Sequence, residues 1–244
     1  HYYLCRQLKG GGMEIIMKKT YNIAIDGPAG AGKSTIAKKV AARLGFIYVD
    51  TGAMYRAMAL YFLEKGIEPE NEAAIKAACQ DISIRIAYEE GVQQVYLNGS
   101  NVSGKIRTEA VGNMASAVST YRAVREKLLQ LQRELAAGED VIMDGRDIGT
   151  CVLPDADTKI YLTAASRVRA ERRYKELTEK GIPCDLEEIE QDIIERDHRD
   201  MTREIAPLKQ AEDAVLVDTS HMTIEEVADR IIQIVSERRT GDGV

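Results

Sequence analysis

The 244-residue sequence predicts an α/β fold built around a parallel sheet. Short apolar, β-prone runs alternate with longer segments whose apolar residues recur at the spacing of a helix. Glycine or proline marks many of the changes from one to the other. Strands and helices that alternate in this way are typical of a parallel sheet with right-handed crossovers. The length suits one domain, or a core that carries small inserted lobes.

The first part of the chain predicts two strands and two helices in alternation. Their expected ranges are 21–26, 36–44, 46–50 and 53–65. The dipeptide Gly27-Pro28 ends the first strand at a turn. Gly45 and Gly66 stand where the helices should end, because glycine tolerates the left-handed conformation common at that position.

The middle of the chain changes to a period of two. Apolar residues alternate with other types over 82–88, and a second strand-like run follows over 92–97. Asn98 and Gly99 next to this run both tolerate positive φ, so they predict a tight hairpin turn. We therefore expect a small antiparallel sheet inserted into the parallel α/β chain.

The last part returns to the α/β pattern. A helix is expected around 124–135, with Gly138 at its end, and three more strands over 141–144, 159–163 and 214–218. Thr223 and Glu226 have the spacing of a capping box, which opens the final helix. The first twelve residues follow neither period. We expect 1–16 to be an appendage to the fold, non-native or disordered.

Composition and charge exclude several classes of protein. There are 33 lysine and arginine residues against 39 aspartate and glutamate, a net charge of −6, which disfavours general nucleic-acid binding. No apolar run reaches the ~18 residues of a membrane helix, and no secretory signal is visible. The dispersed cysteines predict free thiols in a reducing, cytoplasmic compartment: Cys5, Cys79, Cys151 and Cys184. Without a long apolar stripe, a monomer is expected.

The segment Gly27–Ser34 matches G-x-x-x-x-G-K-[ST] at every fixed position. Glycines let consecutive backbone N–H groups turn around an anion, Lys33 reaches the β- and γ-phosphates, and the Ser34 hydroxyl ligates Mg²⁺. The positive end of the following helix dipole adds to the attraction. A dinucleotide-binding motif is excluded because position 35 is not glycine. The motif predicts binding of a nucleoside triphosphate.

The rest of the chain narrows the activity. A GTPase would need N-K-x-D and D-x-x-G motifs, and neither is found. Motor and transport ATPases are normally larger. We therefore expect a small phosphotransferase, with a nucleotide-binding module that has no turnover as the alternative from another class.

Seven arginines lie within 167–203. Four charged residues there would share one helix face, at i, i+3, i+4 and i+7: Arg196, Arg199, Asp200 and Arg203. The planar guanidinium matches phosphate oxygens, and phosphoryl transfer needs positioning and charge stabilisation. We expect this role for Arg196 and Arg203. A solvated helix face is the alternative, and it weighs more for Arg167 and Arg199.

Two further groups of polar residues follow predicted strands, at the edge where such sheets bind ligands. In the first group, Thr51–Arg56, Arg56 could meet an acceptor phosphate; alone, the segment is a turn and a helix. In the second, Asp144 is placed to hold Mg²⁺ through water, and Arg146 and Asp147 follow it. Asp147 could instead only cap the turn or orient Arg146.

The segments GPAGAGKST, DTGAMYR, DGRDIGT and RDHRDMTR occur in this order, and together they resemble the bacterial cytidylate kinases from about Met17 to the C-terminus. The resemblance implies a three-layer P-loop fold with a five-stranded parallel sheet, an acceptor-binding lobe with an inserted antiparallel β segment, and a short helical lid. The implied boundaries are 17–50, 112–166 and 208–244 for the core, 51–111 for the lobe with its insert at about 80–102, and 167–207 for the lid.

The resemblance also implies roles for individual residues. The ATP phosphates would be held by Gly27, Pro28, Ala29, Gly30, Ala31, Gly32, Lys33, Ser34 and Thr35. The acceptor nucleotide would be bordered by Thr51, Tyr55 and Arg56, and its cytosine would be read by Ser116, Arg125 and Asp147. Its phosphate would be held by Arg146 and Arg203, and its sugar or the transferring group by Arg196 and Asp200. The implied catalytic residues are Lys33, Arg146, Arg196 and Arg203, and the implied Mg²⁺ site is Ser34 with Asp144.

The implied reaction is direct in-line transfer of the γ-phosphoryl group from ATP, with Mg²⁺, to CMP or dCMP. The base assignment is chemically consistent, because the Asp147 carboxylate can accept from the exocyclic amine of cytosine and Arg125 can donate to N3 and O2. Uracil reverses the donor at position 4, which predicts discrimination against UMP. A kinase for UMP or another small acceptor is the alternative within the enzyme class.

Overall fold

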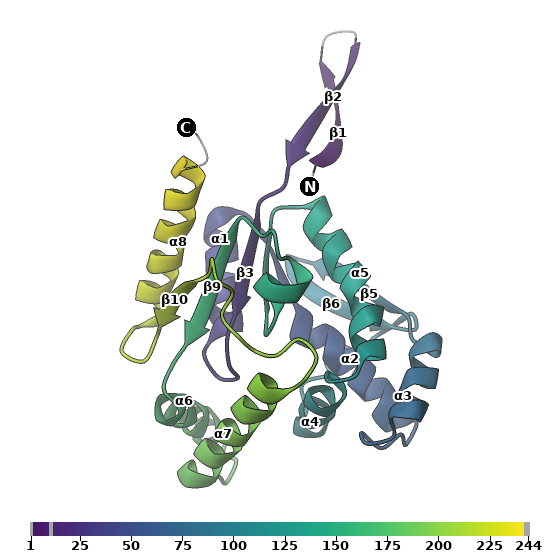
Figure 1. The fold of residues 1–244 in the computed structure, drawn as a ribbon, viewed down its shortest axis with the longest axis vertical. Helices are drawn as coiled ribbons and strands as arrows, with labels where there is room; N and C mark the ends of the chain where they lie inside the picture. The colour runs from purple at the N-terminus through teal and green to yellow at the C-terminus, as the bar shows by residue number, and fades with distance from the viewer. Residues whose placement is uncertain (1, 10–11, 242–244) are drawn as a thin grey trace.

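A computed structural model describes residues 2–9 and 12–241 of the chain, with side chains over 20–240. Its centre is a five-stranded parallel sheet (Figure 1). From one edge to the other, the strands are β10 (Val215–Asp218), β9 (Thr158–Thr163), β3 (Asn22–Asp26), β8 (Val141–Gly145) and β4 (Ile47–Asp50). Ile25 of β3 is level with Asp144 of β8 and Ile160 of β9, so the carboxyl ends of neighbouring strands lie together.

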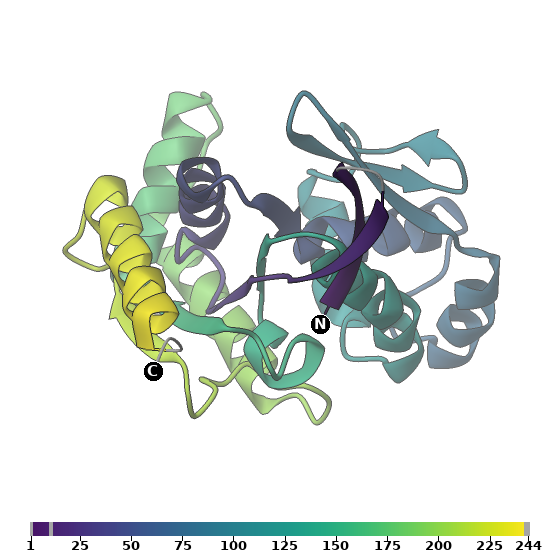
Figure 2. The ribbon, with the colours of Figure 1, turned by 90° about the horizontal axis from the view of Figure 1, so that it is seen from above.

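Helices cover both faces of this sheet and give three layers. The side chains of successive strand residues point to opposite faces. Ile23 and Ile25 of β3 therefore pack with α1 (Lys33–Leu44) and α8 (Ile224–Gly241), while Ala24 packs with the opposite layer. That layer contains α2 (Thr51–Glu64), α4 (Glu109–Val118) and α5 (Arg122–Gly138). Figure 2 shows the two layers on either side of the sheet.

The predicted strands of the parallel sheet are confirmed to within about a residue at each end. Gly45 ends α1 with a φ of 69°, as the sequence predicts. Helix α2 begins two residues earlier than predicted, because the Asp50 carboxylate accepts a hydrogen bond from Ala53 N at 2.9 Å and caps the helix. The capping box also forms: Glu226 N donates to Thr223 Oγ1 at 3.3 Å.

The predicted antiparallel insert is confirmed as a separate three-stranded sheet. Its strands are β5 (Ile84–Glu89), β6 (Val92–Leu97) and β7 (Ser100–Asn101). Asn98 and Gly99 form the turn with φ values of 48° and 85°. The sheet packs against β4 and α2, so it sits beside one edge of the parallel sheet.

Several elements were not predicted. The backbone of β1 (Tyr2–Lys9) pairs with that of β2 (Gly12–Lys19) as an antiparallel hairpin, where the sequence follows no clear period; His1 lies outside the described residues. The other unpredicted elements are α3 (Glu72–Ala78), a single 3₁₀ turn (Cys79–Asp81), α4, and a π-helical turn (Ile148–Val152). Among the described residues, no helix is both long and apolar enough to cross a membrane.

The arginine-rich segment forms α6 (Ser166–Glu179) and α7 (Leu186–Thr202), which pack against each other. The expectation that Arg203 shares a helix face with Arg196 is wrong. Helix α7 ends at Thr202, and Arg203 is extended, with a φ of −61° and a ψ of 141°. The Arg203 side chain is 5% exposed and donates from Nη1 to Ser119 Oγ at 3.3 Å.

Candidate active site

The phosphate-binding loop connects β3 to the N-terminus of α1, in the middle of the sheet. Gly27 has a φ of 152°, and a Cβ added to it would lie 1.9 Å from the carbonyl oxygen of Leu162 on β9. Only glycine therefore lets the loop rest on its neighbouring strand. At the other end of the loop, Gly32 takes the left-handed conformation with a φ of 83° and starts the helix.

Lys33 is buried at the base of this loop. Its Nζ donates to Pro28 O at 2.7 Å. Burial, together with nearby Arg146, lowers the pKa of Lys33 well below its ordinary value. An anion bound in the loop would favour the charged ammonium and offset this desolvation, so the surroundings of Lys33 suit a phosphate group.

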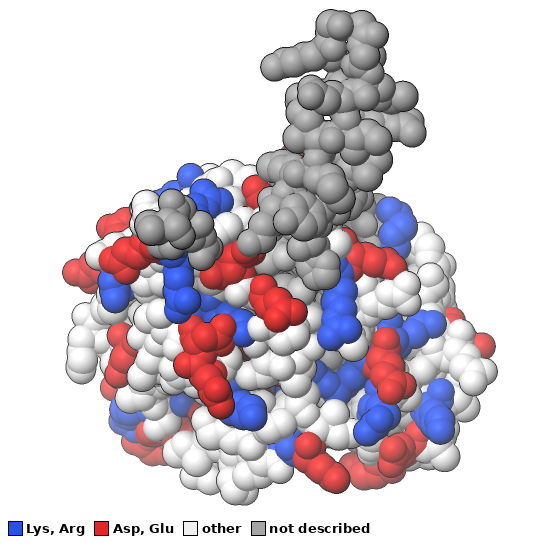
Figure 3. Space-filling model, turned by 45° about the horizontal axis from the view of Figure 1, so that its top comes forward, with Lys and Arg blue, Asp and Glu red and all other residues white. Residues whose placement is uncertain are grey.

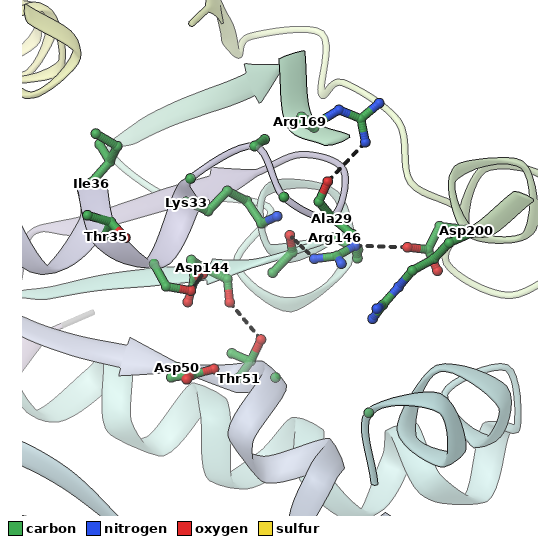
Figure 4. A pocket seen from close by; sticks show the side chains of 18 of the residues that line it. Ala29, Lys33, Thr35, Ile36, Asp50, Thr51, Asp144, Arg146, Arg169 and Asp200 are labelled. Carbon is green, nitrogen blue, oxygen red and sulfur yellow. Dashed lines mark hydrogen bonds and ion pairs between the residues drawn. The ribbon is translucent and has the colours of Figure 1, made fainter. Parts of the chain in front are cut away.

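The loop opens onto a cleft of about 870 Å³ at the carboxyl ends of the strands. Gly27 and Pro28, the first two residues of the loop, are buried and do not line the cleft. Every other predicted site residue does: Ala29, Gly30, Ala31, Gly32, Lys33, Ser34, Thr35, Thr51, Tyr55, Arg56, Ser116, Arg125, Asp144, Arg146, Asp147, Arg196, Asp200 and Arg203. Figure 4 shows Lys33, Asp144 and Arg146 directed into the same space. The fold thus brings together segments that are far apart in the sequence.

Ser34 and Asp144 meet at the floor of the cleft. Ser34 Oγ donates to Asp144 Oδ2 at 2.9 Å, and the Tyr48 hydroxyl donates to Asp144 Oδ1 at 3.0 Å. Burial, and the neighbouring charge of Asp50, raise the pKa of Asp144 to about 6. A buried carboxylate next to a hydroxyl offers the oxygen ligands that Mg²⁺ prefers.

Guanidinium groups occupy the other side of the cleft. Arg146 Nε donates to Asp200 Oδ2 at 2.9 Å and so joins the end of β8 to α7. Burial, and the charge of Arg146, lower the pKa of Arg196 to about 10, and its buried Nε has no hydrogen-bond partner among the described residues. Arg203 Nη2 lies 3.7 Å from Asp147 Oδ1. Guanidiniums that are buried and incompletely paired suit a strongly anionic ligand.

A separate corner of the cleft holds an ion pair between Arg125 and Asp147. The Arg125 guanidinium also lies over the Tyr55 ring, 5.8 Å from its centre, and donates to Ser119 O at 3.2 Å. Burial raises the pKa of Asp147, while Arg125 and Arg203 oppose the rise. The corner offers an acceptor and donors in a fixed arrangement next to an aromatic ring, which is what recognition of a planar base requires.

Comparison with known proteins agrees with this geometry. The model of the cytidylate kinase family matches residues 23–237. A cytidylate kinase from Lactobacillus johnsonii is 48% identical over 232 residues, which are 95% of this chain and 99% of the relative. One from Bacillus cytotoxicus is 51% identical over 223 residues, 91% and 98% of the two chains. The chain belongs to the cytidylate kinase family. Like the rest of that family, it is a nucleoside monophosphate kinase, a phosphotransferase.

A solved structure of a shikimate kinase from Bacteroides thetaiotaomicron is also similar, with 15% identity and a TM-score of 0.45 over 88% of this chain and 98% of that one.

Two of the arginines singled out in the sequence lie away from the cleft of this cytidylate kinase family member. Arg199 is exposed. Arg167 is also exposed and pairs with Glu187 at 2.6 Å and Glu190 at 3.0 Å, which joins α6 to α7. Both fit the solvated helix face that was the alternative. Thr51 lines the cleft, but its hydroxyl donates a hydrogen bond to Asp144 O at 2.7 Å.

Sequence reasoning missed two buried residues that order this cytidylate kinase site. Asp26, at the end of β3, accepts hydrogen bonds from Ile148 N at 2.8 Å and Gly149 N at 2.7 Å, next to Asp147. Arg169 donates from Nη1 to Ala29 O at 2.9 Å (Figure 4). It also donates from Nη2 to Asp197 on α7 at 2.5 Å. A charged residue that ends a buried apolar strand was a usable signal for Asp26; among many arginines, nothing marked Arg169.

One face of the molecule has mixed charge. On the face in Figure 3, lysine and arginine side chains are interspersed with aspartate and glutamate over the described residues.

Proposed function

We propose that the protein transfers the γ-phosphoryl group of ATP to CMP or dCMP, giving ADP and CDP or dCDP. The observation that carries the proposal is the shared cleft: the phosphate-binding loop forms one wall, buried guanidiniums form the other, and the Arg125–Asp147 pair lies at its acceptor end. Two phosphate groups and one base can be recognised there at once. Pyrimidine nucleotide metabolism is the setting that this reaction implies.

The donor side is assigned to the loop. Backbone N–H groups of Gly30, Gly32 and their neighbours would hold the ATP phosphates, with Lys33 near the β- and γ-phosphates. Ser34 and Asp144 would hold Mg²⁺, which would neutralise charge on the phosphates. The hydrogen bond between Ser34 and Asp144 and the raised pKa of Asp144 support this assignment.

The acceptor phosphate is assigned to Arg56, Arg146 and Arg203. Arg196 and Asp200 would contact the sugar or the transferring group; the unpartnered Nε of Arg196 supports this role. The attacking phosphate oxygen is already ionised near neutral pH, so the transfer needs no general base. These side chains would therefore act by aligning the two nucleotides and stabilising the charge of the transition state.

Cytosine is assigned to the corner formed by Ser116, Arg125 and Asp147. Asp147 would accept from the exocyclic amine, and Arg125 would donate to N3 or O2. Bringing cytosine to the existing ion pair keeps both charged groups hydrogen-bonded, whereas uracil would place its O4 against the Asp147 carboxylate. The resulting unpaired buried group should disfavour UMP.

The segment 167–207 is assigned as a lid, and 51–111 as the acceptor lobe, on a core made of 17–50, 112–166 and 208–244. The contacts of Arg146 with Asp200 and of Arg169 with Ala29 support the first assignment, because they tie this segment to the site. Closure over both nucleotides would exclude water and limit ATP hydrolysis. We also propose a monomer in the cytoplasm, where free thiols such as Cys79 and Cys151 stay reduced.

An assay of ADP formation tests the reaction. Purified protein with ATP and Mg²⁺ is given CMP, dCMP, UMP, AMP or no acceptor, and kcat/KM is compared. We expect fast turnover with CMP and dCMP and weaker turnover with UMP. A preference for AMP would refute the cytosine assignment. Equal, slow ATP loss with and without acceptor would instead favour a nucleotide-binding module.

A further inference from the structure

Gln93 on strand β6 of the inserted sheet binds the main chain of a single residue, Asp50, through both ends of its amide. Asp50 N donates to Gln93 Oε1 at 2.9 Å, and Gln93 Nε2 donates to Asp50 O at 3.1 Å. Asp50 is the last residue of β4, the edge strand of the parallel sheet. The amide therefore takes the place that a neighbouring strand would fill, at the carboxyl end of β4.

Asp50 in turn fixes the start of helix α2. Its Oδ1 accepts the capping hydrogen bond from Ala53 N, and its Oδ2 accepts from Arg107 Nη2 at 2.8 Å. The first turns of α2 carry Thr51, Tyr55 and Arg56, all of which line the acceptor side of the cleft. A shift or rotation of the Asp50 peptide would therefore move side chains that face the acceptor.

A second contact fastens the same sheet to β4. The Tyr88 hydroxyl of β5 donates to Tyr48 O at 3.1 Å. The neighbouring Gln94 side chain has a different partner: its Oε1 accepts from Asn101 Nδ2 at 3.1 Å, within the inserted sheet. Because successive residues of a strand point to opposite faces, Gln93 faces the parallel sheet and Gln94 faces away.

We propose that Gln93 is a positioning residue for the acceptor nucleotide, and that it acts through the Asp50 main chain and the first turn of α2. The inference rests on the proposed function, because the affected side chains are those assigned to CMP. The phosphate-binding loop follows a different strand, β3, and both ends of the Gln93 amide are bound to Asp50, so loss of Gln93 should affect the donor nucleotide little.

The test compares Gln93→Ala with Gln94→Ala, a matched control on the same strand that also loses a side-chain hydrogen bond. For Gln93→Ala, we expect kcat/KM for CMP to fall about tenfold, mainly through KM, because both hydrogen bonds that hold the Asp50 main chain are lost. KM for ATP and the dissociation constant of ATP should stay within about twofold. Gln94→Ala should match the wild type in all of these.

Gln93→Met keeps the length of the side chain without its hydrogen bonds and should reproduce the effect if the alanine variant unfolds. Equal behaviour of the Gln93 and Gln94 variants would overturn the proposal. An equal rise in KM for ATP and for CMP would also overturn it, because that result would indicate a general structural role. Failure of the wild type to use CMP would instead refute the proposed function, which the wild-type assay reports separately.

Discussion

Lys33 shows how one buried side chain can favour phosphate binding. It lies at the base of the loop, where burial disfavours the ammonium and a carbonyl oxygen is its hydrogen-bond partner. A bound phosphate would favour the ammonium, and the developing charge of phosphoryl transfer would then meet a cation shielded from water.

Lys33→Met should lower kcat by roughly 10²–10³-fold, the range found when one preorganised charge-stabilising donor is removed. The fold should persist, because methionine fills a similar volume without a buried charge. Lys39→Met is the control, since Lys39 is on the same helix but pairs with Glu225 outside the cleft. Steady-state kinetics with CMP and a melting curve for each variant provide the measurement. A Lys33 variant with wild-type kcat would contradict the assignment.

Asp147→Asn should change base selectivity. The carboxamide can donate as well as accept, so it can pair with O4 of uracil, while its hold on the cytosine amine weakens. We expect the ratio of kcat/KM for CMP to that for UMP to fall by roughly 10²-fold. Asp155→Asn serves as the control on an exposed carboxylate. An unchanged ratio in the Asp147 variant would exclude Asp147 as a base-reading residue.

The buried carboxyl group of Asp26 should make the stability of the protein depend on pH. Burial raises its pKa from 3.8 to about 6 in the folded protein, despite the hydrogen bonds from Gly149 and Ile148. Between about pH 4 and pH 6 the folded state therefore keeps a proton that the unfolded state has lost, and this residue's contribution to stability falls as the pH rises. The full shift corresponds to about 3 kcal/mol.

Denaturant unfolding of the wild type and Asp26→Asn from pH 4 to pH 7 tests this sign. Asparagine does not titrate, so the wild-type free energy of unfolding should decrease relative to that of the variant between pH 4 and pH 6. Parallel curves would show that the Asp26 carboxyl titrates alike in both states.

The sequence predicted many of the side chains that line the cleft. It did not predict which of these side chains pair with each other. Lys33, Asp144 and Arg146 follow recognisable strand ends or motifs. The pairing of Arg125 with Asp147 joins residues 22 positions apart, and no local pattern encodes it. Arg203 was wrongly placed on a helix face, because an i+7 spacing does not reveal that the helix has ended one residue earlier.

Among the elements, the phosphate-binding loop packs directly against strand β9, at Gly27. A Cβ at Gly27 would overlap the carbonyl oxygen of Leu162, a backbone atom of strand β9 in the central sheet. Neither a rotamer change nor a small shift of a side chain can relieve such an overlap.

Gly27→Ala should therefore destabilise the protein by several kcal/mol, about 3 or more, and abolish ATP binding in whatever folds. Gly104→Ala is the matched control, because an added Cβ there meets nothing within 4 Å and its φ is not positive. Thermal unfolding and ATP titration report the two effects. Wild-type stability of the Gly27 variant would show that the loop can move away from β9.

Elements were predictable where local signals agreed. Glycine-bounded apolar strands and α1 match their predicted ranges closely. Helix α4 was missed because Gly112 and Asn113 are poor helix formers, and its helicity depends on burial of Val111, Met114 and Val118 against the rest of the fold. The same dependence on tertiary packing explains why short α3 escaped prediction.

For the whole molecule, we expect the two nucleotides to stabilise segment 167–207 cooperatively. Arg196, Asp200 and Arg203 come from this segment, and Arg169 joins it to the loop. CMP with a non-hydrolysable ATP analogue should protect the amides of α6 and α7 from hydrogen exchange more than the sum of either ligand alone. Strictly additive protection, measured by mass spectrometry, would argue against a lid that closes on both.

The order of the strands in the sheet could not be predicted from the periodicity of the sequence. Alternating strands and helices predict parallel neighbours, but several orders satisfy that pattern, and only the resemblance of the motifs indicated the five-stranded arrangement. The inserted sheet could be predicted from its alternation and its Asn-Gly turn. Its attachment to β4 through Gln93 could not, because one amide binding another segment's main chain leaves no signal in the sequence.

The central position of β3 has a consequence for synthesis on the ribosome. The loop that follows β3 emerges early, yet β3 is flanked by β8 and β9, and Asp26 bonds to Ile148, 122 positions later. A nascent chain that has just exposed its glycine-rich loop lacks both flanking strands and the Leu162 carbonyl against which the loop rests. ATP therefore has no complete donor site to bind until β8 and β9 have been synthesised.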